Sequence, residues 1–282
     1  MAEPGQLAFF LGGYDLEMVA IRDLLAREAP GRYHDRQLAW GAAASAYAVP
    51  IAAELTAGRT VVLVELELDQ ALPEGRYVLV DHHGPRAGRE QPTSLEQVFA
   101  LLQLSAARWT RWLALVAAND RGHIAAMLAL DPPATQDEIE EIRRLDRAAQ
   151  GVTAEQEQAA PAAVAAARVI AGGRLTVVAW PFPRTSPVAD RMETALGGPG
   201  YRNLLVGGGE QVAFFGAGDA VGFLDQRFPG GWYGGELPVR GFWGHHRPLT
   251  DVEAALAEFL ARPETASEKT ELSPFQDGAA RC

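Results

Sequence analysis

The sequence contains a single cysteine, Cys282, which is the last of its 282 residues. A lone cysteine excludes a disulfide framework, and it excludes a structural metal site built from thiolates. The same scarcity is typical of proteins kept in a reducing compartment, so we expect a cytoplasmic protein.

Positive charge and long apolar runs are also scarce. The 25 lysines and arginines are outnumbered by 36 aspartates and glutamates, which gives a formal net charge of −11. This balance disfavours an extended contact with long duplex nucleic acid, but it allows a small basic pocket or bound divalent cations. The Ala-rich stretch 159–173 is too short and too weakly hydrophobic to span a bilayer, and the first residues include an acid where a secretory signal is positively charged. We therefore expect neither a membrane segment nor a signal peptide.

What the sequence does contain is an alternation of short apolar runs with helix-like stretches. Its 48% hydrophobic and 22% charged residues are typical of a globular chain. The apolar runs at 7–11, 60–64 and 78–80 lack polar alternation, and helical patterns such as 16–28 separate them. Buried strands of this kind predict a parallel sheet with helices on both faces.

Further helices are expected downstream of these runs. Helical patterns cover 94–104 and 108–118, after which Asp120 is expected at a helix end or in a loop. Thr135 with Glu138 three residues later is a capping box, which predicts the start of an acidic helix.

The second half of the chain predicts a smaller α/β domain. Thr153 and Gln156 form another capping box, and the Ala-rich helix that they open is expected to run through Ile170. Beyond it we expect strands at 175–180 and 203–215, a helix near Ala220 and a final helix at 250–262. The expected division is a first domain at 1–150, a linker helix at 151–173, a second domain at 174–262 and a flexible tail at 263–282.

Acidic and imidazole side chains follow the apolar runs of the first domain. They are Asp15, Glu17, Glu65, Asp81, His82, His83 and Asp120. Parallel strands bring such residues together at the carboxyl edge of the sheet, where ligands bind. Carboxylates and imidazoles without sulfur favour Mn²⁺ or Mg²⁺ over structural zinc. Two such ions can share a carboxylate, activate a water and neutralise a phosphoryl oxygen.

The stretch VLVDHHGP, residues 78–85, resembles the signature of the DHH phosphoesterases. That family includes single-strand exonucleases, nano-RNA and cyclic-dinucleotide phosphodiesterases, and manganese pyrophosphatases. Its second acidic motif is similar to VVLVELELDQ at 61–70, and its fourth to LVAANDRGHI at 115–124. The glycine-rich pattern of its C-terminal domain is similar to YGGELPVRG at 233–241.

The resemblance implies a two-domain, metal-dependent enzyme with its active site in the cleft between the domains. It implies one or two Mn²⁺ or Mg²⁺ ions held by Asp15, Glu17, Glu65, His82 and Asp120. It makes His83 a contact of the phosphate or leaving group, beside Asp81, which ligates metal or orients a histidine. The substrate-binding residues that it implies in the second domain are Gly234, Gly235, Glu236 and Arg240. The expected substrate is a small nucleotide or short single strand, and a homodimer is compatible with this interpretation.

Several positions depart from the family pattern. Gly13 stands where the first motif has histidine, and Glu17 and Glu65 stand where the family has aspartate. The extra methylene moves a carboxylate by about 1.5 Å unless the backbone retreats, and even ~1 Å of misplacement can cost ~100-fold in rate. Glu236 replaces a phosphate-binding histidine, and Arg240 is expected to restore positive charge there. Three hypotheses therefore stay open. The site holds two metals with the help of a substitute ligand, it holds one metal, or it holds none and the protein only binds its ligand.

Ordinary structural roles also explain these side chains. Asp15 and Glu17 can be ordinary acids in the first turn of a helix. Glu65 can belong to the end of an alternating strand, and Asp120 can cap a turn. A strand end with backbone-bonded histidines accounts for the polar trio at 81–83. An unrelated sheet protein with a coincidental signature is then the third hypothesis. It would be rejected by a structure that gathers four residues around one point: Asp15, Glu65, His82 and Asp120.

Other conspicuous groups favour structural roles. The glycines at 207–209 predict a hairpin rather than a phosphate loop, because no Lys-Ser/Thr and no helix follow them. His123 is expected to be a packing residue, and 245–246 are expected in a surface loop. The aromatic residues Trp232, Tyr233, Phe242 and Trp243 are suited either to stacking nucleobases or to core packing.

Overall fold

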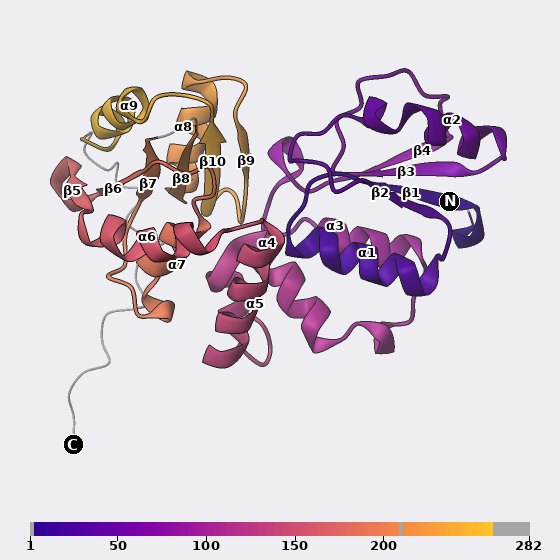
Figure 1. Cartoon of the computed structure of the whole chain (residues 1–282), viewed down its shortest axis with the longest axis horizontal. Coiled ribbons are helices and arrows are strands. Elements are labelled where there is room, and N and C mark those ends of the chain that lie inside the picture. Colours follow the sequence, from indigo (N-terminus) through magenta and orange to yellow (C-terminus); the bar gives the residue numbers. More distant parts are fainter. Residues whose placement is uncertain (1–2, 209–210, 262–282) are drawn as a thin grey trace.

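A computed structural model describes residues 3–208 and 211–261. The chain forms two lobes, each built around its own sheet (Figure 1). The first sheet has the order β2-β1-β3-β4, and all its neighbours pair in parallel. Its strands are β1 (Leu7–Leu11), β2 (Tyr33–Asp35), β3 (Thr60–Val64) and β4 (Tyr77–Val80). The predicted parallel sheet is confirmed, and β2 is an additional strand too short for periodicity to indicate.

Helices cover both faces of this first sheet. The helices α1 (Leu16–Glu28), α3 (Ser94–Leu101), α4 (Arg111–Leu128) and α5 (Gln136–Ala149) share one apolar core with Phe9 and Val62. On the other face, Phe10 and Leu63 pack with the region of α2 (Ala48–Thr56). Successive strand residues point to opposite faces, so burial on both faces explains the unbroken apolar runs.

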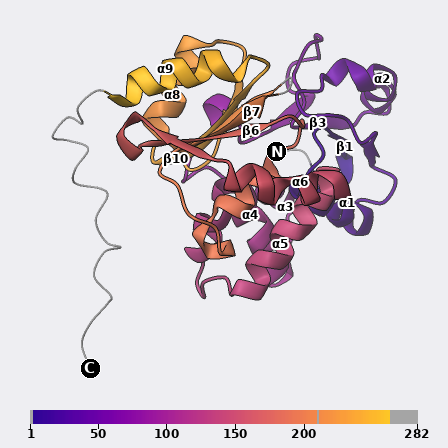
Figure 2. The same cartoon turned by 60° about the vertical axis from the view of Figure 1, so that its left-hand side comes forward.

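The second lobe contains a six-stranded mixed sheet of order β5-β6-β7-β8-β10-β9. Its strands are β5 (Arg168–Ile170), β6 (Leu175–Trp180), β7 (Leu204–Gly208), β8 (Val212–Ala217), β9 (Trp232–Gly234) and β10 (Arg240–His245). The helices α8 (Gly218–Arg227) and α9 (Leu249–Ala261) cover one face, where Figure 2 shows them together. The helices α6 (Ala154–Ala165) and α7 (Ser186–Met192) cover the other.

The expected elements of the second half hold in outline and fail at the end of the Ala-rich helix. The Ala-rich helix does not continue through Ile170, because α6 ends at Ala165 and Arg168–Ile170 pair with β6 as an edge strand. The β-branched Val169 and Ile170 suit a strand better than a helix end. The hairpin predicted from the glycines at 207–209 is confirmed, because β7 and β8 pair antiparallel. Gly209, the last glycine of this run, and Glu210 lie outside the described part of the chain.

The end of the chain follows the prediction as far as it is described. The final helix expected at 250–262 is α9, Leu249–Ala261. The expected flexible tail at 263–282, with Cys282, lies outside the described residues. Within 3–208 and 211–261, none of the helices has the length and apolar content that a bilayer crossing needs.

The helix α4 corrects the expectation that Asp120 lies at a helix end or in a loop. Asp120 lies inside this helix, which starts at Arg111 and continues to Leu128. The backbone leaves helical geometry two residues later, at Gly122 (φ −154°, ψ 25°) and His123 (φ 58°, ψ −142°). A positive φ is costly for histidine, by about 1–3 kcal/mol. The kink therefore separates Asp120 from Ile124 and Met127, which pack in the core of the first lobe.

Candidate metal centre

Polar side chains converge at the carboxyl ends of β1, β3 and β4. Potential ligand atoms form two groups, within each of which all atoms lie within 4.8 Å of one another. One group consists of Glu17, His82 and Asp120, and the other of Glu65, His82 and His83. His82 belongs to both. Loops that follow parallel strands meet at one sheet edge, which is why residues so distant in sequence gather here.

The carboxylates of Glu17 and Glu65 each have one oxygen held by the protein and one that is not. Glu17 Oε1 accepts a hydrogen bond from the Leu95 amide (2.9 Å), and Glu65 Oε1 accepts one from Ser94 Oγ (2.8 Å). The other oxygens are buried and make no hydrogen bond within the described residues, and the same is true of Asp120 Oδ2 and His82 Nε2. His82 Nε2 instead faces Glu17 Oε2 (3.7 Å) and contacts Asp120 Oδ2. Buried polar atoms normally have partners, so the three such atoms that Glu17, His82 and Asp120 bring together fit a cation between them.

The N-terminus of α3 orients both glutamates. Thr93 caps this helix in a full capping box with Glu96, and the next two residues supply the donors to Glu65 and Glu17. Helix N-termini favour nearby negative charge. The sequence pattern indicated Ser94 only as a helix start, and the Thr93-to-Glu96 spacing is the signal that would have located this helix end.

Ser94→Ala should weaken Mn²⁺ binding while leaving the fold intact. It removes the hydroxyl that holds Glu65 Oε1, so the carboxylate is free to rotate away. Loss of an orienting partner typically costs ~10–100-fold in metal affinity. Isothermal titration calorimetry with Mn²⁺ measures this change. Ser105→Ala is the matched control, because Ser105 caps a short 3₁₀ helix without a side-chain hydrogen bond. Equal affinities for both variants would contradict a role for Ser94.

The backbone at Glu65 departs from the strand that precedes it. Glu65 has a left-handed backbone (φ 52°), although its amide still donates to Val80 O (2.8 Å). Gly12 packs so closely on it that a Cβ at that position would overlap the Glu65 carbonyl. The Glu65 carboxylate thus stands on a backbone that has left the extended geometry of β3.

Asp15 does not join either group. Its carboxylate caps α1 by accepting from the Met18 amide (2.9 Å), and the residue is 7% exposed. Asp15 is therefore an ordinary acid at the start of a helix. The carboxylate of Glu17, two residues later, points to His82. Of the four residues named as a test of coincidence, Glu65, His82 and Asp120 lie in the ligand groups, which argues against a coincidental signature.

Asp81 orients His83 instead of joining a ligand group. Its Oδ1 accepts from the His83 amide (2.9 Å) and lies 3.2 Å from Nδ1, while Arg86 pairs with Oδ2 (3.3 Å). Burial opposes ionisation of Asp81, but the hydrogen bonds from His83 lower the carboxyl pKa. Burial also lowers the pKa of His83 to about 4, so its ring is neutral at neutral pH. A neutral imidazole is the form that binds metals.

Burial and mutual repulsion raise the pKa values of the acids at the site. Burial raises the pKa of Glu17 to about 8, and repulsion from Asp120 adds to it. Burial likewise raises the pKa of Asp15 to about 7, with repulsion from Asp146. The pKa values of Glu65 and Asp120 are raised well above normal by burial, and by repulsion from Asp15. A divalent cation here would favour the ionised form of all four.

The metal-free protein should lose stability as the pH rises toward 8. A raised carboxyl pKa means that the native chain holds protons which the unfolded chain releases above its ordinary value of 4.5. The free energy of unfolding therefore falls between about pH 4.5 and the native value of about 8. Thermal unfolding at pH 6 and pH 8 measures this, and Glu17→Gln should reduce the difference. A wild-type melting temperature that stays constant or rises from pH 6 to pH 8 would contradict this expectation.

The second lobe reaches the site through β9 and β10. A Cβ at Gly234 would lie 3.1 Å from the His83 ring, and the ring centroids of Phe242 and His83 are 6.2 Å apart. Trp243, the next residue along, is fully buried, since adjacent strand residues face opposite sides. Phe242 thus lies at the candidate metal centre, and Trp243 lies in the core of the second lobe.

The cation beside Glu236 is not the predicted one. Arg89 lies 3.6 Å from the Glu236 carboxylate, which itself packs against Gly122 of α4. Arg240 lies over the Tyr201 ring (5.7 Å) and donates to the Arg202 carbonyl (3.2 Å). The expectation that Arg240 offsets the Glu236 charge is therefore wrong. Arg240 begins β10 and its side chain is directed to the body of the second lobe, whereas Arg89 comes from the loop that follows His83.

Comparison with solved structures identifies the arrangement of the two lobes. RecJ from Thermus thermophilus in complex with Mn²⁺ superimposes with a TM-score of 0.51 at 14% identity, over 92% of this chain and 53% of that one. This chain has a RecJ-like fold. It spans about half the length of the Thermus thermophilus protein. No protein-family model and no curated protein sequence matches the chain.

Two further RecJ structures are similar at lower scores. The Thermus thermophilus protein in complex with Mg²⁺ gives a TM-score of 0.46 at 14% identity, over 92% of this chain and 50% of that one. An exonuclease RecJ bound to manganese gives 0.45 at 15% identity, over 95% and 93% of the two chains.

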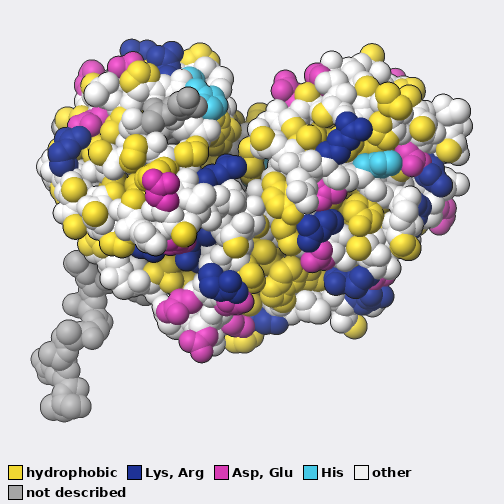
Figure 3. Space-filling model, in the orientation of Figure 1, with side chains coloured by type: hydrophobic (Ala, Val, Ile, Leu, Met, Phe, Trp, Pro, Cys, Tyr) yellow, Lys and Arg dark blue, Asp and Glu magenta, His cyan; other side chains and the backbone are white. Residues whose placement is uncertain are grey.

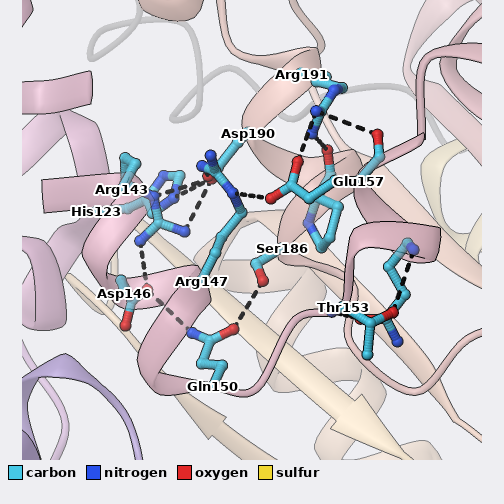
Figure 4. Close-up of polar contacts among 12 residues, drawn as sticks. His123, Arg143, Asp146, Arg147, Gln150, Thr153, Glu157, Ser186, Asp190 and Arg191 are labelled. Atoms are coloured by element: carbon cyan, nitrogen blue, oxygen red, sulfur yellow. Dashed lines mark hydrogen bonds and ion pairs between the residues drawn. The ribbon is translucent and has the colours of Figure 1, made fainter. Parts of the chain in front are cut away.

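A buried ionic network joins the two lobes of this RecJ-like fold behind the ligand groups (Figure 4). Arg143 of α5 donates to Asp190 of α7 (2.9 Å), to Asp146 (2.7 Å) and to Asn119, the neighbour of Asp120 (2.8 Å). Asp146 also accepts from the Leu16 amide at the start of α1 (3.3 Å).

His123 belongs to this network, contrary to its expected packing role. Its Nε2 lies 3.2 Å from Asp190 Oδ1, and Arg147 also pairs with Asp190. Burial opposes ionisation of Asp190, but Arg143 and His123 hold its pKa well below the usual range. The docking of the second lobe and the support of the ligand-bearing segments thus depend on the same side chains.

Proposed function

We propose that this chain is a divalent-metal-dependent phosphoesterase. It hydrolyses a phosphodiester or phosphoanhydride bond in a small nucleotide or a short single-stranded oligonucleotide. The observation that carries the proposal is the set of buried ligand atoms on Glu17, His82 and Asp120 that lie together without hydrogen bonds among the described residues, with Glu65 in a second group that shares His82. The signature at 78–85 and the RecJ-like fold support it, because RecJ belongs to the same DHH superfamily and was solved in complex with Mn²⁺.

The donor set fits manganese or magnesium. Carboxylate oxygens and neutral imidazoles suit these ions, and the site has no sulfur ligand. Glu17, His82 and Asp120 would hold one ion, and Glu65, His82 and His83 provide a second, overlapping set of ligands. When bound, such an ion supplies positive charge for a phosphoryl oxygen and lowers the pKa of a coordinated water.

The protein groups around the site have defined tasks in this proposal. The Asp81 carboxylate holds His83 in one orientation, so that its neutral ring faces the space between the lobes. Arg86 and Arg89 follow His83 and provide the positive charge for the substrate phosphates. The space-filling view shows a notch between the two lobes (Figure 3). A site between lobes is the usual place for a small ligand.

The second candidate function is binding of a nucleotide or protein partner without turnover. Gly13 favours it, because this position has no side chain to ligate a metal, and the Trp40 indole packs against it. A chain of this kind would keep the fold and the ligand groups but would not hydrolyse substrate.

The test is hydrolysis of bis(p-nitrophenyl) phosphate and a panel of dinucleotides and short oligonucleotides with Mn²⁺. The intact protein is compared with the double variant His82→Ala plus His83→Ala, and His246→Ala is the control because this histidine is exposed. Activity that disappears only in the double variant supports the phosphoesterase. Binding of Mn²⁺ and nucleotide by the wild-type protein without any hydrolysis would favour the second candidate.

A further inference from the structure

Trp40 is an exposed tryptophan in contact with the candidate metal centre. It is 39% exposed, and its ring lies edge-on to His83 with centroids 4.4 Å apart and planes at 80°. Trp112 is similarly exposed, at 36%, but lies at the start of α4. Removing exposed aromatic surface from water is favourable, so the Trp40 side chain beside His83 offers apolar surface that a bound ligand can cover.

One face of the indole rests on Gly13. A Cβ at Gly13 would lie 3.2 Å from both Cδ1 and Nε1 of Trp40 and 3.3 Å from Cγ. Nearly equal distances to three atoms of the five-membered ring place Gly13 over the ring face rather than at its edge. The exposed 39% of Trp40 therefore lies on the rest of the indole, away from the face that Gly13 covers.

A second aromatic ring reaches His83 from the other lobe. Phe242 of β10 lies 6.2 Å from the His83 centroid with planes at 60°. Gly234 of β9 lets both rings pack close to its backbone, since a Cβ there would lie 2.9 Å from Phe242 and 3.1 Å from His83. Aromatic rings from both lobes thus flank the histidine that faces the ligand groups.

Two partly exposed cationic side chains follow His83 in the chain and pair with acids. Arg86 is 3.3 Å from the Asp81 carboxylate and Arg89 is 3.6 Å from that of Glu236. Both are about half-exposed, so their remaining donors face solvent at the rim of the site. A flat apolar surface beside positive charge and a phosphate-cleaving centre matches the chemistry of a nucleotide, which has a planar base and an anionic phosphate.

We propose that Trp40 is a specificity-determining residue whose open indole face stacks on the nucleobase next to the cleaved phosphate. This inference rests on the proposed phosphoesterase function and assigns its substrate class, a base-bearing nucleotide rather than a phosphate ester in general. Stacking on an aromatic side chain accepts any base, because every base has a π-face. The site therefore selects for the presence of a base, and not for its identity.

The experiment compares two substrates with the same sugar-phosphate backbone, an adenine dinucleotide and its abasic counterpart. The variants are Trp40→Ala and Trp40→Phe, with Trp112→Ala as the matched control, and Mn²⁺ titration checks each variant for an intact centre. Loss of one stacked base should lower kcat/KM for the adenine dinucleotide by about 10- to 100-fold in Trp40→Ala, mainly through KM. Trp40→Phe should recover part of this loss. The abasic substrate should be hydrolysed equally by wild type and variants.

Equal losses on both substrates, or no loss on either, would overturn the proposal. If the wild-type protein hydrolyses neither substrate, only the proposed phosphoesterase function fails. The stacking role is then tested by nucleotide binding, measured through tryptophan fluorescence. Adenosine monophosphate should then quench the tryptophan fluorescence of wild type and of Trp112→Phe, but not that of Trp40→Phe. Quenching that persists in Trp40→Phe, or that is absent from the wild-type protein, would overturn the stacking role.

Discussion

His82→Ala should abolish divalent-metal binding, with at least ~100-fold lower affinity for Mn²⁺, because outer-shell substitutions alone cost ~10–100-fold. His82 is the residue that the two ligand groups share, and it is only 4% exposed. Its Nε2 lies 3.7 Å from Glu17 Oε2 and contacts Asp120. Removing this imidazole therefore takes a ligand from both groups at once and leaves three buried carboxylates without the nitrogen that they face.

Calorimetric titration with Mn²⁺ measures both the affinity and the number of ions. Glu65→Gln and Asp120→Asn each remove a charged ligand from one group only. If two ions bind, each of these variants should lose about one equivalent of Mn²⁺, whereas His82→Ala loses both. If one ion binds, one of the two single variants should bind as wild type does. The site assignment is contradicted by a His82→Ala protein that binds Mn²⁺ like His246→Ala.

Arg143→Met should destabilise the protein by about 3–5 kcal/mol, the usual cost of removing one partner from a buried ionic network. Arg143 is 4% exposed and donates to Asp190, Asp146 and Asn119. Without the guanidinium, the buried Asp190 keeps only Arg147 and His123 as partners of opposite charge among the described residues. Methionine has a similar volume, so the expected loss comes from uncompensated charge rather than from a cavity.

Chemical denaturation followed by circular dichroism measures the change in unfolding free energy. Arg144→Met is the matched control, because the adjacent Arg144 has a 58% exposed side chain and pairs with Glu141 on the helix surface. Exposed pairs of this kind contribute ~0.3–0.5 kcal/mol. Adding Asp190→Asn to Arg143→Met should recover part of the stability, since it removes the charge left behind. Similar free energies for the two arginine variants would show that the buried network contributes little.

Much of the first lobe could be predicted from the sequence because buried parallel strands leave a distinctive pattern. The apolar runs at 7–11, 60–64 and 78–80 are β1, β3 and most of β4. The acids and histidines that follow them gather because all three strands end at the same edge. The capping boxes of α5 and α6 are present as predicted, since they depend only on residues three positions apart.

The details of the site depended on contacts that spacing does not encode. Asp15 and Glu17 are equally plausible ligands in sequence, yet one side chain caps α1 and the other reaches His82. Spacing indicates Arg240 as the cation beside Glu236 because the two lie close in the chain, whereas the actual partner, Arg89, approaches from the other lobe. Neither distinction can be made without knowing where the neighbouring elements pack.

The helix boundaries failed where local signals were misleading. Asn119 and Asp120 are typical of turns, but Asn119 is held inside α4 by Arg143, and the break comes two residues after Asp120. The alanines before Arg168 favour a helix, but pairing with β6 outweighs that preference for the three residues that follow. Tertiary contacts decided both cases.

The contact between Gly13 and Trp40 limits how this site can change in evolution. A histidine at position 13 would place its Cβ 3.2 Å from the indole, closer than ordinary van der Waals contact, before any imidazole atom is added. Replacing Trp40 first would instead uncover Gly13 without supplying a ligand. Any side chain at position 13 therefore requires the Trp40 indole to shift by a few tenths of an ångström, so the residues acceptable at these two positions depend on each other.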